Sequence, residues 1–152
     1  MEKNKALAKA MEFCARSEKS IKDTKLHLSS IGAKADQMDD IIDQLLNEGF
    51  IDEHRYAQAF VTDKYRFNSW GRKKISHQLS AKGIPSNLIN EALDTLDPDE
   101  YYKHLKEQLE KKSGSIKGGS YYEKKAKLTR FAAGRGYEMD LIFDAIDELL
   151  KK

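Results

Sequence analysis

Apolar residues recur in the same pattern behind three glycines of this 152-residue chain. They stand six, nine, ten and thirteen positions after each glycine, a spacing that lines up one face of an α-helix. The glycines lie 51 and 53 residues apart, so the pattern is an internal repeat of about fifty residues. The copies are Gly32 with Met38, Ile41, Ile42 and Leu45, Gly83 with Ile89, Ala92, Leu93 and Leu96, and Gly136 with Ile142, Ala145, Ile146 and Leu149.

Each glycine is also preceded, four residues earlier, by an apolar residue: Leu28, Leu79 or Ala132. This predicts a helix that ends at the glycine in a left-handed cap. No stretch alternates apolar and polar residues with β-branched side chains, so we expect no sheet. The pattern predicts nine helices, at 4–17, 20–31, 35–48, 53–67, 70–82, 86–96, 97 to about 112, 121–134 and 138–150.

Residues that favour helix starts precede several of these ranges. Three of them, Ser20, Asp97 and Ser120, are followed by an acid three residues later, as in a capping box. Two further starts are expected at Asp52 and Ser69. After about residue 112 we expect a loop, because glycine and serine recur at 113–120.

The predicted fold is all-α: three tandem three-helix repeats forming an elongated, curved array with helices at right angles. We place the repeats at 1–49, 50–96 and 97–152. The junctions are short and partly apolar, which favours modules packed on their neighbours over beads on a string.

Composition excludes several function classes. The apolar runs are too short to cross a membrane and the start lacks a secretion signal, so we expect a cytoplasmic protein with no membrane partner. The lone cysteine, Cys14, lies in an apolar pattern and is expected to be a buried core thiol. The four histidines are scattered, and no nucleophile or phosphate-loop motif is present. We therefore predict no enzymatic activity, catalytic residue, metal, cofactor or small-molecule substrate.

Charge is distributed in blocks, although the net charge is only +2. Residues 55–85 hold seven lysines and arginines against one acid, and residues 103–135 hold ten against three. Such blocks can steer a polyanion or an acidic protein onto one side of a molecule. The candidate binding residues are Arg55, Lys64, Arg66, Arg72, Lys73, Lys74, Lys82, Lys124, Lys125, Lys127, Arg130 and Arg135.

The densest candidate segment is 64–75, where Tyr65, Phe67 and Trp70 alternate with five cations across a turn between helices. Cations and a helix N-terminus attract phosphates, and aromatic rings can stack on bases. We favour a partner for the basic residues. For Phe67 and Trp70 we favour a role in anchoring the turn in the core.

The stretch from Gly49 to Ile84 resembles the RecX family of bacterial regulators. That family carries a glycine, an aromatic, an acidic pair and an Arg-Tyr-Ala or Arg-Phe-Ala step, then a basic helix closing in Lys-Gly-Ile or Lys-Gly-Phe. Here these are Gly49, Phe50, Asp52-Glu53, Arg55-Tyr-Ala and Lys82-Gly-Ile, with Glu53 in place of the usual second Asp. The resemblance extends over nearly the whole chain and is weakest in the first repeat.

The resemblance implies three three-helix modules and a non-enzymatic role. RecX-like proteins modulate the RecA recombinase, usually by inhibition, and are thought to lie in the groove of its filament on single-stranded DNA. The implied partners are the RecA filament and single-stranded DNA, met directly or through the filament, and the implied setting is DNA repair, recombination and the SOS response. Two alternatives stay open: a stand-alone DNA-binding helical protein, and a helical-repeat scaffold for an acidic protein.

Overall fold

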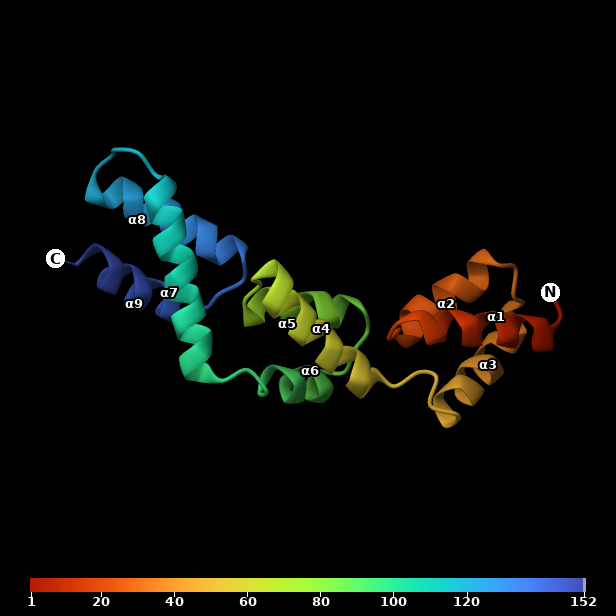
Figure 1. The fold of residues 1–152 in the computed structure, drawn as a ribbon. Coiled ribbons are helices and arrows are strands. Elements are labelled where there is room, and N and C mark those ends of the chain that lie inside the picture. The colour runs from red at the N-terminus through yellow and green to blue at the C-terminus, as the bar shows by residue number, and fades with distance from the viewer. Residues whose placement is uncertain (152) are drawn as a thin grey trace. The chain divides into compact units, whose positions relative to one another are not determined.

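The computed structural model describes residues 1–151, and within them all regular structure is α-helical (Figure 1). The nine helices are α1 Lys3–Arg16, α2 Ile21–Ser30, α3 Ala35–Asn47, α4 Glu53–Asn68, α5 Arg72–Ala81, α6 Ser86–Leu93, α7 Pro98–Ser115, α8 Tyr121–Gly134 and α9 Met139–Leu150. Each predicted helix is present, and the absence of strands among the described residues agrees with the sequence.

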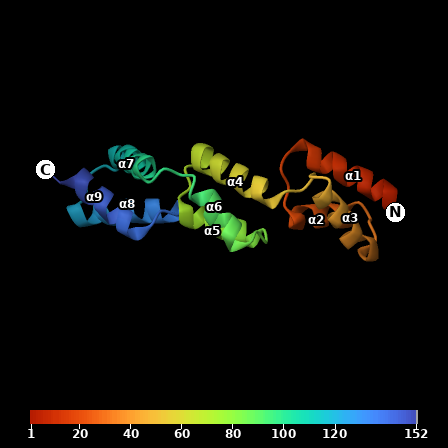
Figure 2. The same cartoon turned by 90° about the horizontal axis from the view of Figure 1, so that it is seen from below.

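The helices divide into two compact units, and α4 and α5 contribute residues to both. The first unit comprises Met1–Val61 and Gln78–Ala92, and the second comprises Thr62–His77 and Leu93–Lys152. In the second unit α7, α8 and α9 pack on one another, and Figures 1 and 2 both show them as one group.

The glycine pattern builds the same helix end three times. Gly32, Gly83 and Gly136 have φ of 89°, 79° and 92°, the left-handed region that glycine adopts without steric cost. In each copy the glycine N–H donates three residues back and the following residue's N–H donates five residues back, to Leu28, Leu79 or Ala132. These paired hydrogen bonds form the Schellman motif, so the predicted caps are confirmed.

The apolar ladder behind each glycine forms the core. In the first unit Ile41 and Leu45 are fully buried beside Ala6, Ala10 and Leu28. In the second unit Ile142 and Ile146 are fully buried, as are Leu105, Leu109 and Leu128. Cys14 is also buried as predicted, and burial raises the pKa of its thiol.

Most of the predicted helix starts are confirmed. Ser20 with Asp23 and Ser120 with Glu123 form complete capping boxes, and the side chains of Asp52 and Asp97 accept from the backbone N–H three residues on. Ser69 is an exception, because α5 begins at Arg72 and Ser69 itself adopts a φ of 56° in the preceding turn.

Two helix ends also differ from the sequence prediction. Helix α7 continues through Gly114 to Ser115, where a loop was expected from residue 113, and α6 ends at Leu93 rather than at residue 96. In α7 the helical hydrogen-bond ladder outweighs the weak propensity of a single glycine near a helix end.

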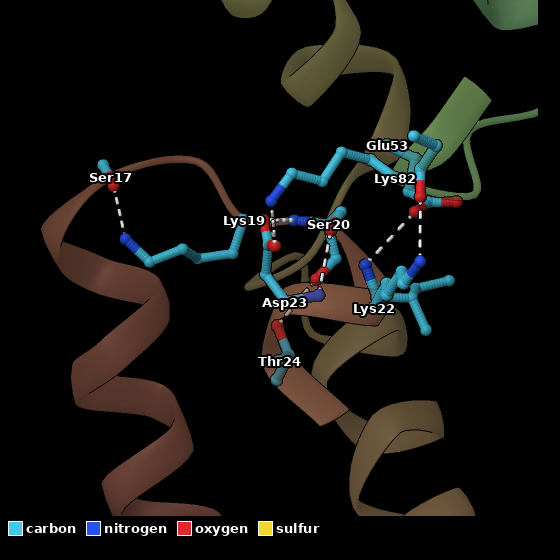
Figure 3. Close-up of polar contacts among 10 residues, drawn as sticks. Ser17, Lys19, Ser20, Lys22, Asp23, Thr24, Glu53 and Lys82 are labelled. Atoms are coloured by element: carbon cyan, nitrogen blue, oxygen red, sulfur yellow. Dashed lines mark hydrogen bonds and ion pairs between the residues drawn. The ribbon is translucent and has the colours of Figure 1, made fainter. Parts of the chain in front are cut away.

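An ion pair connects α2 to the end of α5 within the first unit (Figure 3). Lys82 Nζ lies 2.7 Å from Asp23 Oδ1, and Lys22 Nζ donates to the Ala81 carbonyl at 2.9 Å. Burial alone would raise the pKa of Asp23, but hydrogen bonds from Lys82 and Ser20 outweigh it and hold that pKa below its ordinary value.

We expect Lys82→Met to destabilise the protein by about 1 kcal/mol, because Asp23 loses a charged donor in a partly buried site. A carboxylate whose pKa is lowered by folding stabilises the protein above its unfolded pKa, and that stability is lost as pH falls through the folded pKa. The wild type should therefore lose more stability than the variant between about pH 5 and pH 3. Urea titrations at several pH values measure this difference, and parallel losses in both proteins would contradict the assignment.

Candidate nucleic-acid and protein interface

The candidate cations differ in whether a carboxylate neutralises them. In the first unit Arg55 Nε lies 3.0 Å from Glu18 Oε2, and its Nη1 lies 3.7 Å from Asp52 Oδ2. Lys82 is paired with Asp23 as described above. Both candidates of this unit are therefore joined to acids of their own chain, which lowers their attraction for an external anion.

The start of α5 is held entirely by the second unit's own atoms. Gly71 N–H donates to the Arg135 carbonyl at 2.7 Å, Arg72 N–H to the Tyr101 hydroxyl at 2.9 Å and Lys73 N–H to the Gly136 carbonyl at 2.9 Å. These bonds take the place of the expected Ser69 cap. They also occupy N–H groups that a helix N-terminus would otherwise offer to a phosphate.

Arg72 belongs to the same network. Its Nη1 donates to Glu138 Oε2 at 2.9 Å, its guanidinium carbon lies 3.9 Å from the centre of the Tyr101 ring, and the Tyr101 hydroxyl donates to Glu138 Oε1 at 2.5 Å. Burial, together with the Glu138 carboxylate, raises the pKa of Tyr101. The Arg72 charge is therefore neutralised and only partly accessible.

The other cations of the 64–75 segment differ from Arg72 in the groups that surround them. Lys64 Nζ and Lys74 Nζ lie 5.1 and 4.6 Å from the centre of the Trp70 ring, at cation–π distance. Arg66 and Lys73 are exposed, and no acid of the described chain forms an ion pair with either.

Phe67 is 81% exposed, which contradicts the expectation that it anchors the turn in the core. It follows the buried Tyr65 by two positions and so points away from the face of α4 that carries Tyr65. The exposed Phe67 ring adds an aromatic side chain to the surface of the 64–75 segment.

Four candidate cations, Lys124, Lys125, Lys127 and Arg130, form a basic stripe on α8. Most of them have no acidic partner among residues 1–151. Lys125 reaches Asp147 at 4.0 Å, whereas Lys124, Lys127 and Arg130 form no ion pair with any described residue. Arg135 Nη1 donates to the side-chain carbonyl of Gln108 at 3.1 Å, a neutral partner that leaves its charge uncompensated.

Two hollows of the second unit adjoin this stripe. One, of about 490 Å³, is lined by Lys111, Lys112, Ser115, Phe131 and Arg135, among others. The other, of about 530 Å³, shares Lys112, Ser115 and Phe131 and adds Ile116, Lys117, Lys127 and Arg130. Sequence reasoning missed Lys111, Lys112 and Lys117. Their signal was present in the excess of cations at 103–135, but they border or lie within the glycine- and serine-rich stretch at 113–120, which resembles a flexible loop.

Other chemistry has little support in the described part of the chain. Its His, Cys, Asp and Glu side chains form no cluster that could hold a metal ion. None of the described helices combines the length and apolar character that spanning a bilayer requires.

Comparison with known proteins connects this architecture to one family. Residues 52–93 match the second three-helix domain of RecX, and residues 99–146 match the third. The chain is 31% identical over 147 residues to the regulatory protein RecX of Clostridium botulinum strain Eklund 17B, covering 95% of this chain and 67% of that protein. It is 30% identical over 149 residues to RecX of Chlorobium phaeobacteroides strain BS1, covering 97% and 95%.

Relatives differ in length. The RecX of Halalkalibacterium halodurans is 26% identical over 140 residues, 92% of this chain, and the chain spans about half of that protein, 53%. The crystal structure of RecX from Lactobacillus salivarius superposes with a TM-score of 0.87 at 24% identity, covering 97% of this chain and 96% of that one. This likeness confirms the all-α helical-repeat fold.

Proposed function

This chain belongs to the RecX family, and from that membership we propose that it binds RecA filaments on single-stranded DNA and inhibits their ATPase and strand exchange, without catalysing a reaction itself. Its partners are then RecA and the DNA strand, and its setting is DNA repair, recombination and the SOS response. The observation that carries the proposal is the group of uncompensated cations on the second unit, of which Arg66, Lys73, Lys124, Lys127 and Arg130 are the leading contact residues. We further propose three modules, at 1–49, 50–96 and 97–152.

The stand-alone DNA-binding alternative is disfavoured by the start of α5. A recognition helix inserts its N-terminal residues into the major groove. Here the first N–H groups of α5 bond to Tyr101 and Gly136, and Arg72 is paired with Glu138. A helix held in this way presents only its exposed flank, which suits contact with phosphates or acidic side chains.

The deciding measurement is the DNA-dependent ATPase of a cognate RecA, with and without the protein. We expect stoichiometric protein to lower the ATPase, and Arg66→Glu with Lys73→Glu to abolish most of that inhibition because both charges are exposed and uncompensated. Lys74 is left intact, since its Nζ lies 4.6 Å from the centre of the Trp70 ring and a charge reversal would also remove that cation–π contact.

The matched control reverses two exposed lysines of the first unit, Lys5→Glu with Lys34→Glu. This control should inhibit RecA like the wild type, and circular dichroism should show equal helix content in all three proteins. An unchanged ATPase at stoichiometric excess of the wild type would refute the proposed function. Equal inhibition by both double variants would mean instead that Arg66 and Lys73 are solvated surface.

A further inference from the structure

The two hollows on the second unit adjoin each other, and together we call them the α7–α8 groove. They have Lys112, Ser115 and Phe131 in common as lining residues. Each has a volume typical of a small-ligand pocket, several hundred Å³. A ligand that occupies both hollows must pass over the three residues that they share.

The groove carries a large uncompensated positive charge. Six cations line it, and Glu107 is its only acid: the cations are Lys111, Lys112, Lys117, Lys127, Arg130 and Arg135. Within the described chain none of the six forms an ion pair. Arg55, Arg72 and Lys82, by contrast, all do. An external anion is therefore attracted more strongly to the groove than to these paired cations.

Two of the six cations are held in place by neutral groups. Arg135 donates to Gln108, whose amide nitrogen in turn donates to the buried Tyr137 hydroxyl at 2.7 Å. Arg135 and Lys112 also lie over the Phe131 ring, 4.7 and 5.5 Å from its centre. Cation–π contact orients these side chains without neutralising them. The charge is thus arranged before any ligand binds.

The lining favours a nucleic-acid strand over an acidic peptide. Protein interfaces concentrate their binding energy in aromatic or apolar anchors. Here the lining offers only Phe131 and Ile116 as such, and cations already lie over the Phe131 ring. Lysine and arginine side chains with serine hydroxyls are groups that contact phosphate and sugar, independent of base sequence. Unpaired nucleotides can enter hollows of this size, whereas a stiff duplex cannot follow them.

We propose that the α7–α8 groove binds the sugar–phosphate backbone of a single-stranded nucleic acid, irrespective of its base sequence. The inference deepens the proposed function and rests on it for its biological setting: the third three-helix module would hold the DNA strand. Lys111, Lys112 and Lys117 are then binding residues in addition to the stripe on α8.

The test is fluorescence anisotropy of a labelled oligothymidylate of about 16 nucleotides with the whole protein and no RecA. If all six cations contact phosphates, the logarithm of the binding constant falls against the logarithm of salt concentration with a slope of about −4. Lys111→Gln with Lys117→Gln, one exposed residue from each hollow, should reduce that slope to about −3. The control pair Lys5→Gln with Lys34→Gln should keep the wild-type slope.

Any of four results would overturn the groove assignment, and three of them are an unchanged slope in the Lys111 and Lys117 variant, equal competition by a duplex of the same length, and equal competition by polyglutamate at matched charge. Displacement of the strand by dTMP at micromolar concentration would do so as well, since it would indicate a site for a free nucleotide. Because RecA is absent, the outcome is separable from the ATPase result. A protein that binds the strand with the expected slope and leaves the ATPase unchanged keeps the groove and loses the proposed function.

Discussion

Replacing Gly136 with alanine is expected to destabilise the second unit by about 3 kcal/mol or more, through two independent costs. The first is conformational, because a φ of 92° strains any residue with a Cβ. The second is steric: a Cβ at this position would lie 2.3 Å from Lys74 Cβ and 2.5 Å from Lys74 N. The backbone of α5 cannot retreat easily, because Lys73 N–H is bonded to the Gly136 carbonyl.

Gly83→Ala is the matched control, because it separates these two costs. Its φ of 79° is similar, but a Cβ there would meet no atom within 4 Å. The control should therefore show only the conformational cost, about 1 to 2 kcal/mol. Urea unfolding followed by circular dichroism measures both variants. Equal losses in the two would show that α5 does not pack tightly on the glycine turn.

The contrast between these glycines shows what a sequence pattern can and cannot predict. The repeat predicted the left-handed caps at Gly32, Gly83 and Gly136 because a helix end and its apolar ladder are local, within about four turns of chain. It could not predict that Gly136 lies against Gly71 and Lys74, since that contact joins segments far apart in sequence. The wrong Ser69 cap has the same cause: a carbonyl and a hydroxyl from distant residues replaced the local side chain.

The candidate site was predictable to the same degree. Composition located the basic blocks, and the described residues do carry exposed cations in both of them. Counting charges could not tell Arg72, which meets Glu138 66 residues away, from Lys73 beside it. Helical geometry could have placed Phe67 correctly, because Tyr65 is on the buried face and residues two apart lie on opposite sides of a helix.

Removing the Tyr101 hydroxyl is the second change from which we expect a large effect. Tyr101 is fully buried, and its oxygen both accepts from Arg72 N–H and donates to Glu138 Oε1. Tyr101→Phe keeps the ring under the Arg72 guanidinium but leaves one backbone donor and one carboxylate oxygen without that partner. The expected loss is about 2 kcal/mol, in the range for unsatisfied groups of which one is charged. Tyr101→Ala also opens a cavity and should cost about 4 kcal/mol.

Tyr122→Phe provides the control, since that hydroxyl belongs to a ring that is 80% exposed and its removal should change the free energy of unfolding by less than about 0.5 kcal/mol. The series is measured by urea unfolding at pH 7. If the Tyr101 hydroxyl positions the start of α5, Tyr101→Phe should also weaken the proposed inhibition of RecA, because Lys73 follows Arg72 at that helix start. A Tyr101→Phe protein as stable as the Tyr122→Phe control would mean that solvent replaces the hydroxyl, and that Arg72 and Glu138 hold this helix start by themselves.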